Sequence, residues 1–123
     1  MKSSYATIAS YRTKDGSEIR ELMHPEQHGN RAQSLAEAIV WPGQHTALHQ
    51  HTRTEELYHI TAGRGVMTLG DQRFSVAAGD TICIAPGTPH CLSNTEDEPL
   101  KLLCCCSPPY SHTDTVLLPA DES

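Results

Sequence analysis

The sequence contains no long apolar segment and few aromatic side chains. Aromatic residues make up 5% of the chain, and no hydrophobic run approaches the roughly 20 residues with which a helix crosses a bilayer. The first ten residues, Met1 to Ser10, are polar and do not resemble a signal peptide. These absences predict a protein with no membrane partner and a cytoplasmic location.

The chain also lacks a surplus of positive charge. It has 15 acidic residues against 9 Lys and Arg, a formal net charge of -6. Nucleic-acid binding requires a basic face that neutralises phosphates, so no nucleic-acid partner is expected. With 37% hydrophobic residues and a mean hydropathy of -0.43, the composition is that of an ordinary globular protein. This charge balance gives only weak support for a small-molecule substrate as the partner.

Disulfide bonds are not expected either. The five cysteines are an odd number, and Cys104, Cys105 and Cys106 are consecutive, which does not suit pairing within a strand. Reduced thiols agree with a cytoplasmic location. Strand alternation directs Cys104 and Cys106 to the interior, where cysteine acts as a small apolar residue; a redox role or a role beside a site is the alternative.

Helical periodicity is scarce, whereas short apolar stretches recur between Gly, Pro, Asp and Asn turns, a pattern typical of all-β proteins. At 123 residues, one domain (1–123) is expected, with a core barrel at about 17–106 and a proline-containing tail, 107–123, that wraps over the barrel or frays. The predicted strands are Glu18 to Met23, Ser34 to Val40, Ala47 to His51, Glu56 to Ala62, Arg64 to Leu69, Gln72 to Val76, Asp80 to Ile84, His90 to Ser93 and Leu100 to Cys106.

A cluster of metal-binding residue types is predicted in the middle of the chain. Side chains alternate along a strand, so His49 and His51 point the same way and can chelate one ion, although an exposed histidine pair is the alternative. Alternation also places Glu56 and Tyr58 on one face, and an inward carboxylate is costly unless it is paired or metal-bound. His90 follows the turn Pro86 to Pro89, which directs it toward the same cavity.

The spacing of these residues resembles the cupin superfamily. Gly43, His49-Gln50-His51, Glu56 and Gly63 reproduce its first motif, and the stretch from Gly79 to His90, followed by Asn94, is similar to its second. Ala85 departs from the pattern, which usually has proline there. The resemblance implies a double-stranded β-helix (jelly-roll) barrel over nearly the whole chain. It also implies that His49, His51, Glu56 and His90 bind a metal.

Three imidazoles and one carboxylate suit one divalent transition metal ion, and this set does not choose among Fe, Mn, Zn, Ni, Co and Cu. The resemblance extends to phosphomannose-isomerase-like and polyketide-cyclase-like cupins. In some small cupin lyases the counterpart of Tyr58 is catalytic, which implies a proton-transfer role here, with a core tyrosine as the alternative. A second catalytic tyrosine of those lyases has no clear match, and Tyr110 is a loose candidate.

Three functions follow from this resemblance. The first is a metalloenzyme that acts on a small oxygenated metabolite by Lewis-acid and proton-transfer chemistry, as an isomerase, epimerase, cyclase or lyase. The second is an Fe(II)-dependent dioxygenase, and the third is a non-catalytic ligand-binding or sensing module. A sugar phosphate is weakly supported, because only Arg64 lies near the motifs. Small cupins of this kind commonly form homodimers, which is the expected assembly.

The remaining polar residues are assigned to the surface. His45 is expected at the rim of the cavity and His59 on the outer face of its strand. The other histidines, His24, His28 and His112, lie in polar or turn-rich segments and are expected to be solvated. Glu37 is expected to face outward, with a second carboxylate near the pocket as the alternative.

Overall fold

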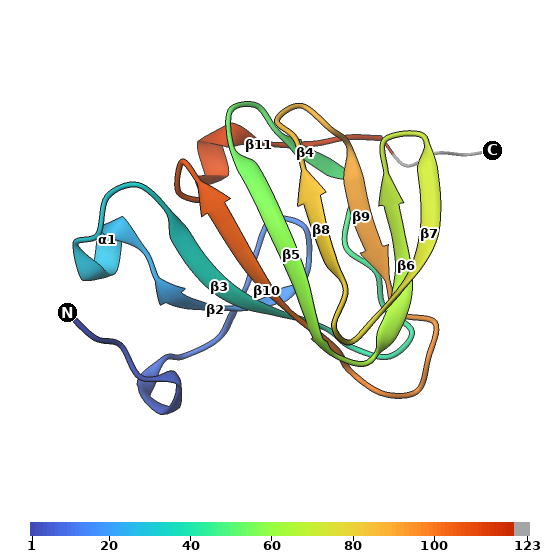
Figure 1. The fold of residues 1–123 in the computed structure, drawn as a ribbon, viewed down its shortest axis with the longest axis horizontal. Helices are drawn as coiled ribbons and strands as arrows, with labels where there is room; N and C mark the ends of the chain where they lie inside the picture. Colours follow the sequence, from blue (N-terminus) through green and yellow to red (C-terminus); the bar gives the residue numbers. More distant parts are fainter. Residues whose placement is uncertain (120–123) are drawn as a thin grey trace.

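Two antiparallel sheets form the protein, and a computed structural model describes residues 1–119 (Figure 1). The strands are β1 (Tyr11–Arg12), β2 (Glu18–Met23), β3 (Ser34–Val40), β4 (His49–His51), β5 (Glu55–Ala62), β6 (Arg64–Leu69), β7 (Gln72–Ala77), β8 (Thr81–Ile84), β9 (His90–Ser93), β10 (Leu100–Ser107) and β11 (Thr115–Leu117). The helical segments are η1 (Tyr5–Thr7), α1 (Pro25–His28) and η2 (His112–Asp114). The predicted all-β class is confirmed.

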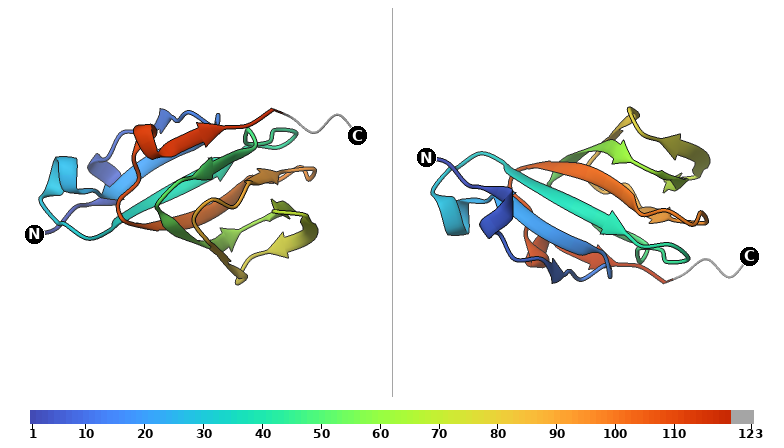
Figure 2. Two further views of the ribbon diagram at one scale, coloured as in Figure 1. Left: turned by 90° about the horizontal axis from the view of Figure 1, so that it is seen from above. Right: turned by 90° about the horizontal axis from the view of Figure 1, so that it is seen from below.

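The strands are ordered β1-β2-β3-β10-β5-β8 in the first sheet and β11-β4-β9-β6-β7 in the second. Figure 2 shows the two sheets as separate layers that face each other. All the predicted strands are present, with ends that differ by at most two residues. The sequence did not predict β1 and β11, which are too short to show an alternating pattern.

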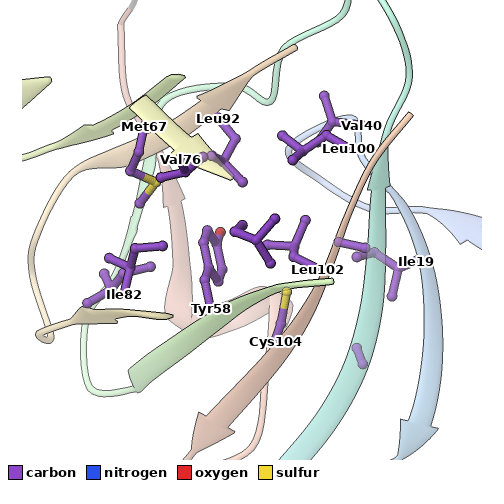
Figure 3. Close-up of a cluster of buried hydrophobic side chains, with 14 residues drawn as sticks. Ile19, Val40, Tyr58, Met67, Val76, Ile82, Leu92, Leu100, Leu102 and Cys104 are labelled. Atoms are coloured by element: carbon purple, nitrogen blue, oxygen red, sulfur yellow. The ribbon is translucent and has the colours of Figure 1, made fainter. Parts of the chain in front are cut away.

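The core lies between the sheets because inward residues alternate with outward ones. In β5, Glu56, Tyr58 and Ile60 are buried while the residues between them are exposed. In β10, alternate residues from Leu100 to Cys106 are buried in the same way. Figure 3 shows Tyr58 within this cluster, surrounded by apolar side chains from both sheets. Burial of this apolar surface is the main source of stability.

Two glycine turns hold the strands of the barrel in place. Gly63 joins β5 to β6 with a φ of +83°, and a Cβ atom at this position would lie 2.4 Å from the carbonyl oxygen of Pro99, so only glycine fits. Gly87 has a φ of +78°, and its N–H donates to the carbonyl oxygen of His51 (2.7 Å), which connects the turn before β9 to β4. Ala85 leaves this turn intact, since its carbonyl still accepts from Thr88 N–H (3.2 Å).

The segment after β10 packs against the second sheet and against the β1–β2 loop. The segment after residue 107 contributes β11, which pairs with β4 at the edge of the second sheet, so the strands extend past the predicted limit near residue 106. Lys14 in the β1–β2 loop donates through Nζ to the carbonyl oxygens of His112 (3.3 Å) and Thr115 (2.8 Å). The last four residues of the predicted tail, 120–123, lie outside the described residues.

The structure also bears on membrane-spanning helices and on the state of the cysteines. Within residues 1–119, no helix is long and apolar enough to cross a membrane. All five cysteines lie in this part of the chain, and each is a free thiol, as expected from their number and spacing.

Candidate metal centre

Four buried polar side chains meet between the sheets. His49 and His51 come from β4 and His90 from the adjacent β9, where His49 and His90 are directly paired across the strands. Glu56 comes from β5 in the opposite sheet. Each is at most 5% exposed, and the three imidazoles offer ligand atoms within 4.8 Å of one another. The structure therefore brings together the four residues that the sequence predicted as ligands.

The ring orientations of His49 and His90 are fixed by the backbone. Nδ1–H of His49 donates to the carbonyl oxygen of Ala47 (2.8 Å), and Nδ1–H of His90 donates to that of Thr88 (2.9 Å). A carbonyl only accepts, so these partners assign the proton to Nδ1 and leave the lone pair on Nε2. Burial, followed by the neighbouring His90, lowers the pKa of His49, which keeps this imidazole neutral at pH 7.

A hydroxyl orients the third imidazole. Thr115 in β11 donates through Oγ1 to the carbonyl oxygen of Ser111 (2.8 Å), so its hydroxyl proton is already used. The same Oγ1 lies 3.0 Å from Nδ1 of His51 and therefore accepts from it. His51 is thus also protonated on Nδ1, with its Nε2 lone pair free. Histidine ligands of metals are typically oriented by such hydrogen bonds on the other ring nitrogen.

The carboxylate of Glu56 faces two of these nitrogens. Its Oε1 lies 3.2 Å from Nε2 of His51 and 3.5 Å from Nε2 of His90. Burial by itself raises the pKa of Glu56, but His51 and His90 outweigh burial and lower this pKa to about 2 when their Nε2 atoms carry a proton and donate to the carboxylate. Lone pairs on a carboxylate oxygen and an imidazole nitrogen repel at this distance unless a cation, either a proton or a metal ion, lies between them.

The arrangement fits a transition metal ion. Bonds of about 2.0 to 2.2 Å to nitrogen and oxygen place neighbouring ligand atoms about 3.0 to 3.5 Å apart, which agrees with the separations around Glu56 Oε1. Within the described residues, Glu56 Oε1 and His90 Nε2 are fully buried and have no hydrogen-bond partner. A bound cation would satisfy both atoms, and these four residues would hold it.

Tyr58 lies beside the four polar side chains and lines the same cavity, whose volume is about 40 Å³. The rings of Tyr58 and His90 have their centroids 5.9 Å apart. Burial, with a further contribution from Glu56, raises the pKa of Tyr58 well above its ordinary value, so the phenol stays protonated. This volume is larger than the space that one water molecule needs, which leaves room beside an ion for a small molecule.

The structure adds two residues to the predicted site. Cys106 donates its thiol to Oε2 of Glu56 (3.2 Å), so the preferred interpretation of Cys106 as a purely apolar core residue is wrong. Tyr110, a loose candidate from the sequence, lines the cavity with its ring centroid 5.9 Å from that of His51. Strand alternation placed Cys106 inside, but the sequence did not show that it lies directly opposite Glu56 in the β10–β5 pair.

The other histidines are not brought to this site. His59 is exposed on the outer face of β5, as predicted, and it hydrogen-bonds Thr81, whereas His45 is exposed and pairs with Ser93 in an isolated bridge. The expectation that His24 is solvated is wrong, because it is 8% exposed and hydrogen-bonds the carbonyl oxygen of Tyr110 through Nε2 (2.8 Å). Glu37 lies on the outer face, where it accepts from Tyr5.

The chain belongs to the cupin family. A family model described as Cupin domain matches residues 36–106, which include all four candidate ligands. Over 118 residues, the chain is 54% identical to the uncharacterized protein MJ1618 of Methanocaldococcus jannaschii, covering 96% of this chain and 94% of that protein.

Solved structures agree with this assignment. A predicted oxalate decarboxylase (tm1287) of Thermotoga maritima is 26% identical, with a TM-score of 0.76 and coverage of 87% of this chain and 98% of that one. The polyketide cyclase RemF of Streptomyces resistomycificus has a TM-score of 0.82 and 19% identity, covering 99% and 88%. At that identity RemF shows the fold alone, and the predicted jelly-roll barrel is confirmed.

The hydrogen bond from His51 to Thr115 gives a first prediction. Thr115→Val removes the acceptor for Nδ1–H of His51 with little change in shape, and we expect the affinity for a divalent metal to fall about 10- to 100-fold. Isothermal titration calorimetry measures this change. Thr81→Val is the matched control, because it removes the same kind of contact from His59 on the outer face. Equal affinities for the two variants would contradict the prediction.

Proposed function

We propose that His49, His51, Glu56 and His90 bind one divalent transition metal ion: Fe, Mn, Zn, Ni, Co or Cu. The observation that carries the proposal is the convergence of three Nε2 lone pairs and an ionised carboxylate in one buried cavity. Two of these atoms, Glu56 Oε1 and His90 Nε2, have no hydrogen-bond partner among the described residues. Buried polar atoms without a partner are costly. A bound cation would serve as the partner of both atoms.

The proposed activity is that of a metalloenzyme acting on a small oxygenated metabolite. The ion would act as a Lewis acid that polarises a carbonyl or enediol-like group. Tyr58 would donate a hydrogen bond or a proton to the substrate, since it lines the same cavity and no hydrogen bond from its hydroxyl to another described residue is present. Isomerisation, epimerisation, cyclisation and elimination all require this combination of polarisation and proton transfer.

The comparisons support an enzymatic function. The structures similar to this chain include a protein described as a predicted oxalate decarboxylase and one described as a polyketide cyclase. Cupin barrels host many unrelated reactions, so the reaction of this chain must follow from its own site. The apolar walls around one polar centre favour a substrate with a carbon skeleton and an oxygen group at one end.

Metal content gives the second prediction. After reconstitution with each candidate ion, the wild-type chain is expected to retain about one equivalent, measured by elemental analysis after gel filtration. His51→Ala removes one ligand and leaves Glu56 partly unpaired, so we expect its metal affinity to fall roughly 100-fold or more. His59→Ala is the control, because His59 is an exposed imidazole three residues after Glu56. Less than a tenth of an equivalent with every ion would contradict the proposal.

The role of Tyr58 gives the third prediction. In a metabolite screen, Tyr58→Phe is expected to retain metal and lower turnover about 10²- to 10⁴-fold, the usual contribution of a positioned proton donor. Unchanged turnover would reduce Tyr58 to a packing residue.

Oxygen uptake that depends strictly on Fe(II) would instead favour the dioxygenase. Metal binding with no turnover in the whole screen would leave the sensing module as the function.

We propose that the chain forms a homodimer through the outer face of the first sheet. Leu35, Cys105, Leu57 and Cys83 lie directly opposite one another across β3, β10, β5 and β8 and form an apolar row. Leu57 is 41% exposed despite its position in the middle of a sheet. A second copy of the chain would cover this row, as the family resemblance implies.

The dimer gives the fourth prediction. Light scattering at micromolar concentration is expected to give twice the mass of the chain, and Leu57→Glu is expected to shift it to the monomer by placing a charge in the apolar row. Leu117→Glu adds the same charge on β11, away from the row, and should leave the mass unchanged. A monomeric wild type, or equal dissociation of both variants, would rule out this interface.

A further inference from the structure

A second carboxylate faces the candidate metal centre from the loop between β1 and β2. One oxygen of Asp15, Oδ1, accepts three hydrogen bonds, from Ser17 N–H (3.0 Å), Ser17 Oγ (2.7 Å) and Thr13 Oγ1 (2.7 Å). The loop itself is held by Ala47 N–H, which donates to the carbonyl oxygen of Asp15 (2.7 Å). Oδ1 is thereby fixed, and the other oxygen is left for a different partner.

That other oxygen lies in the cavity. Oδ2 of Asp15 is 3.6 Å from Nε2 of His49, and the Asp15 side chain is 14% exposed. Because Nδ1 of His49 carries the proton given to Ala47, Nε2 offers no hydrogen to Asp15. The contact is between two lone pairs, so Oδ2 requires a donor from the contents of the cavity. Asp15 thus borders the candidate metal centre on the side of His49, whereas Glu56 approaches His51 and His90.

Glu21 of β2 lines the same cavity and is also incompletely paired. It is 6% exposed, and its Oε1 accepts from the hydroxyl of Tyr11 (3.1 Å). Within residues 1–119, its Oε2 has no hydrogen-bond partner. Burial raises the pKa of Glu21, and its Oε2 adds a hydrogen-bonding group to the cavity. A buried oxygen without a partner is costly unless a ligand satisfies it.

No cationic side chain offsets these groups. Among the residues that the structure describes, neither lysine nor arginine lines the cavity. Lys14, next to Asp15 in sequence, directs its Nζ to the carbonyl oxygens of His112 and Thr115 instead. The charge of a divalent ion is cancelled by the two carboxylates of Asp15 and Glu56. The site as a whole therefore does not attract an anion.

We propose that Asp15 and Glu21 form a substrate-binding subsite that selects a neutral molecule bearing two or more hydroxyl groups and rejects dianions such as oxalate. The proposal rests on the metal site proposed above. One oxygen of the substrate binds at the ion, and neighbouring hydroxyls donate to Asp15 Oδ2 and Glu21. The carbon skeleton contacts the apolar wall that Ile19, Ala36 and Leu102 provide.

The fifth prediction tests this selectivity with two probes of similar size, dihydroxyacetone and oxalate. Both are titrated into the Co(II)-loaded protein while the visible spectrum of the ion is recorded. Wild-type protein is expected to bind dihydroxyacetone and to bind oxalate at least tenfold more weakly. Asp15→Asn keeps the fixed Oδ1 and removes one charge, so the affinity for oxalate is expected to rise about tenfold or more and that for dihydroxyacetone to fall.

Asp71→Asn is the control for this experiment, because it makes the same substitution at an exposed hairpin turn and should leave both affinities unchanged. Glu21→Gln supplies a second variant that is independent of the folding of the Asp15 loop, and it is expected to weaken dihydroxyacetone binding severalfold. Wild-type binding of oxalate that matches or exceeds Asp15→Asn would overturn the subsite while leaving the metal site in place. Absence of bound Co(II) would overturn both proposals.

Discussion

The repulsion between lone pairs on opposite sheets is the constraint on which the rest of this site depends. Glu56 projects from β5 toward His51 and His90, and its Oε1 approaches both Nε2 atoms within hydrogen-bond range. Each imidazole has its proton on the other nitrogen, held by an acceptor outside the cavity. Packing the two sheets together therefore produces a buried site that favours a cation, either a proton or a metal ion, between the imidazoles and the carboxylate.

Strand pairing holds these groups in place. His49 is opposite His90 in the β4–β9 pair, Thr115 is opposite His51 in the β11–β4 pair, and Cys106 is opposite Glu56 in the β10–β5 pair. A shift of one residue in any of these pairs would turn a site residue to the outer face. The same hydrogen-bonded ladders thus stabilise the barrel and position its polar centre.

Much of this architecture could be predicted from the sequence, because it depends on local patterns. Alternation along β5 places Glu56 and Tyr58 inside and His59 outside, whatever the neighbouring strands are. The two histidines of β4 share a face for the same reason. The strands β1 and β11 were not predicted, since two or three residues carry no periodicity, and their position depends on the sheets that they join.

The sequence by itself therefore determined the all-β class, the inward faces of the strands and the four candidate ligands. Only the tertiary structure decided what surrounds them. Thr115 lies 64 residues from His51, and Cys106 lies 50 residues from Glu56, so neither contact follows from spacing along the chain. Asp15 reaches the cavity because the β1–β2 loop packs against Ala47. Such contacts depend on how distant segments dock, whereas alternation depends only on the geometry of one strand.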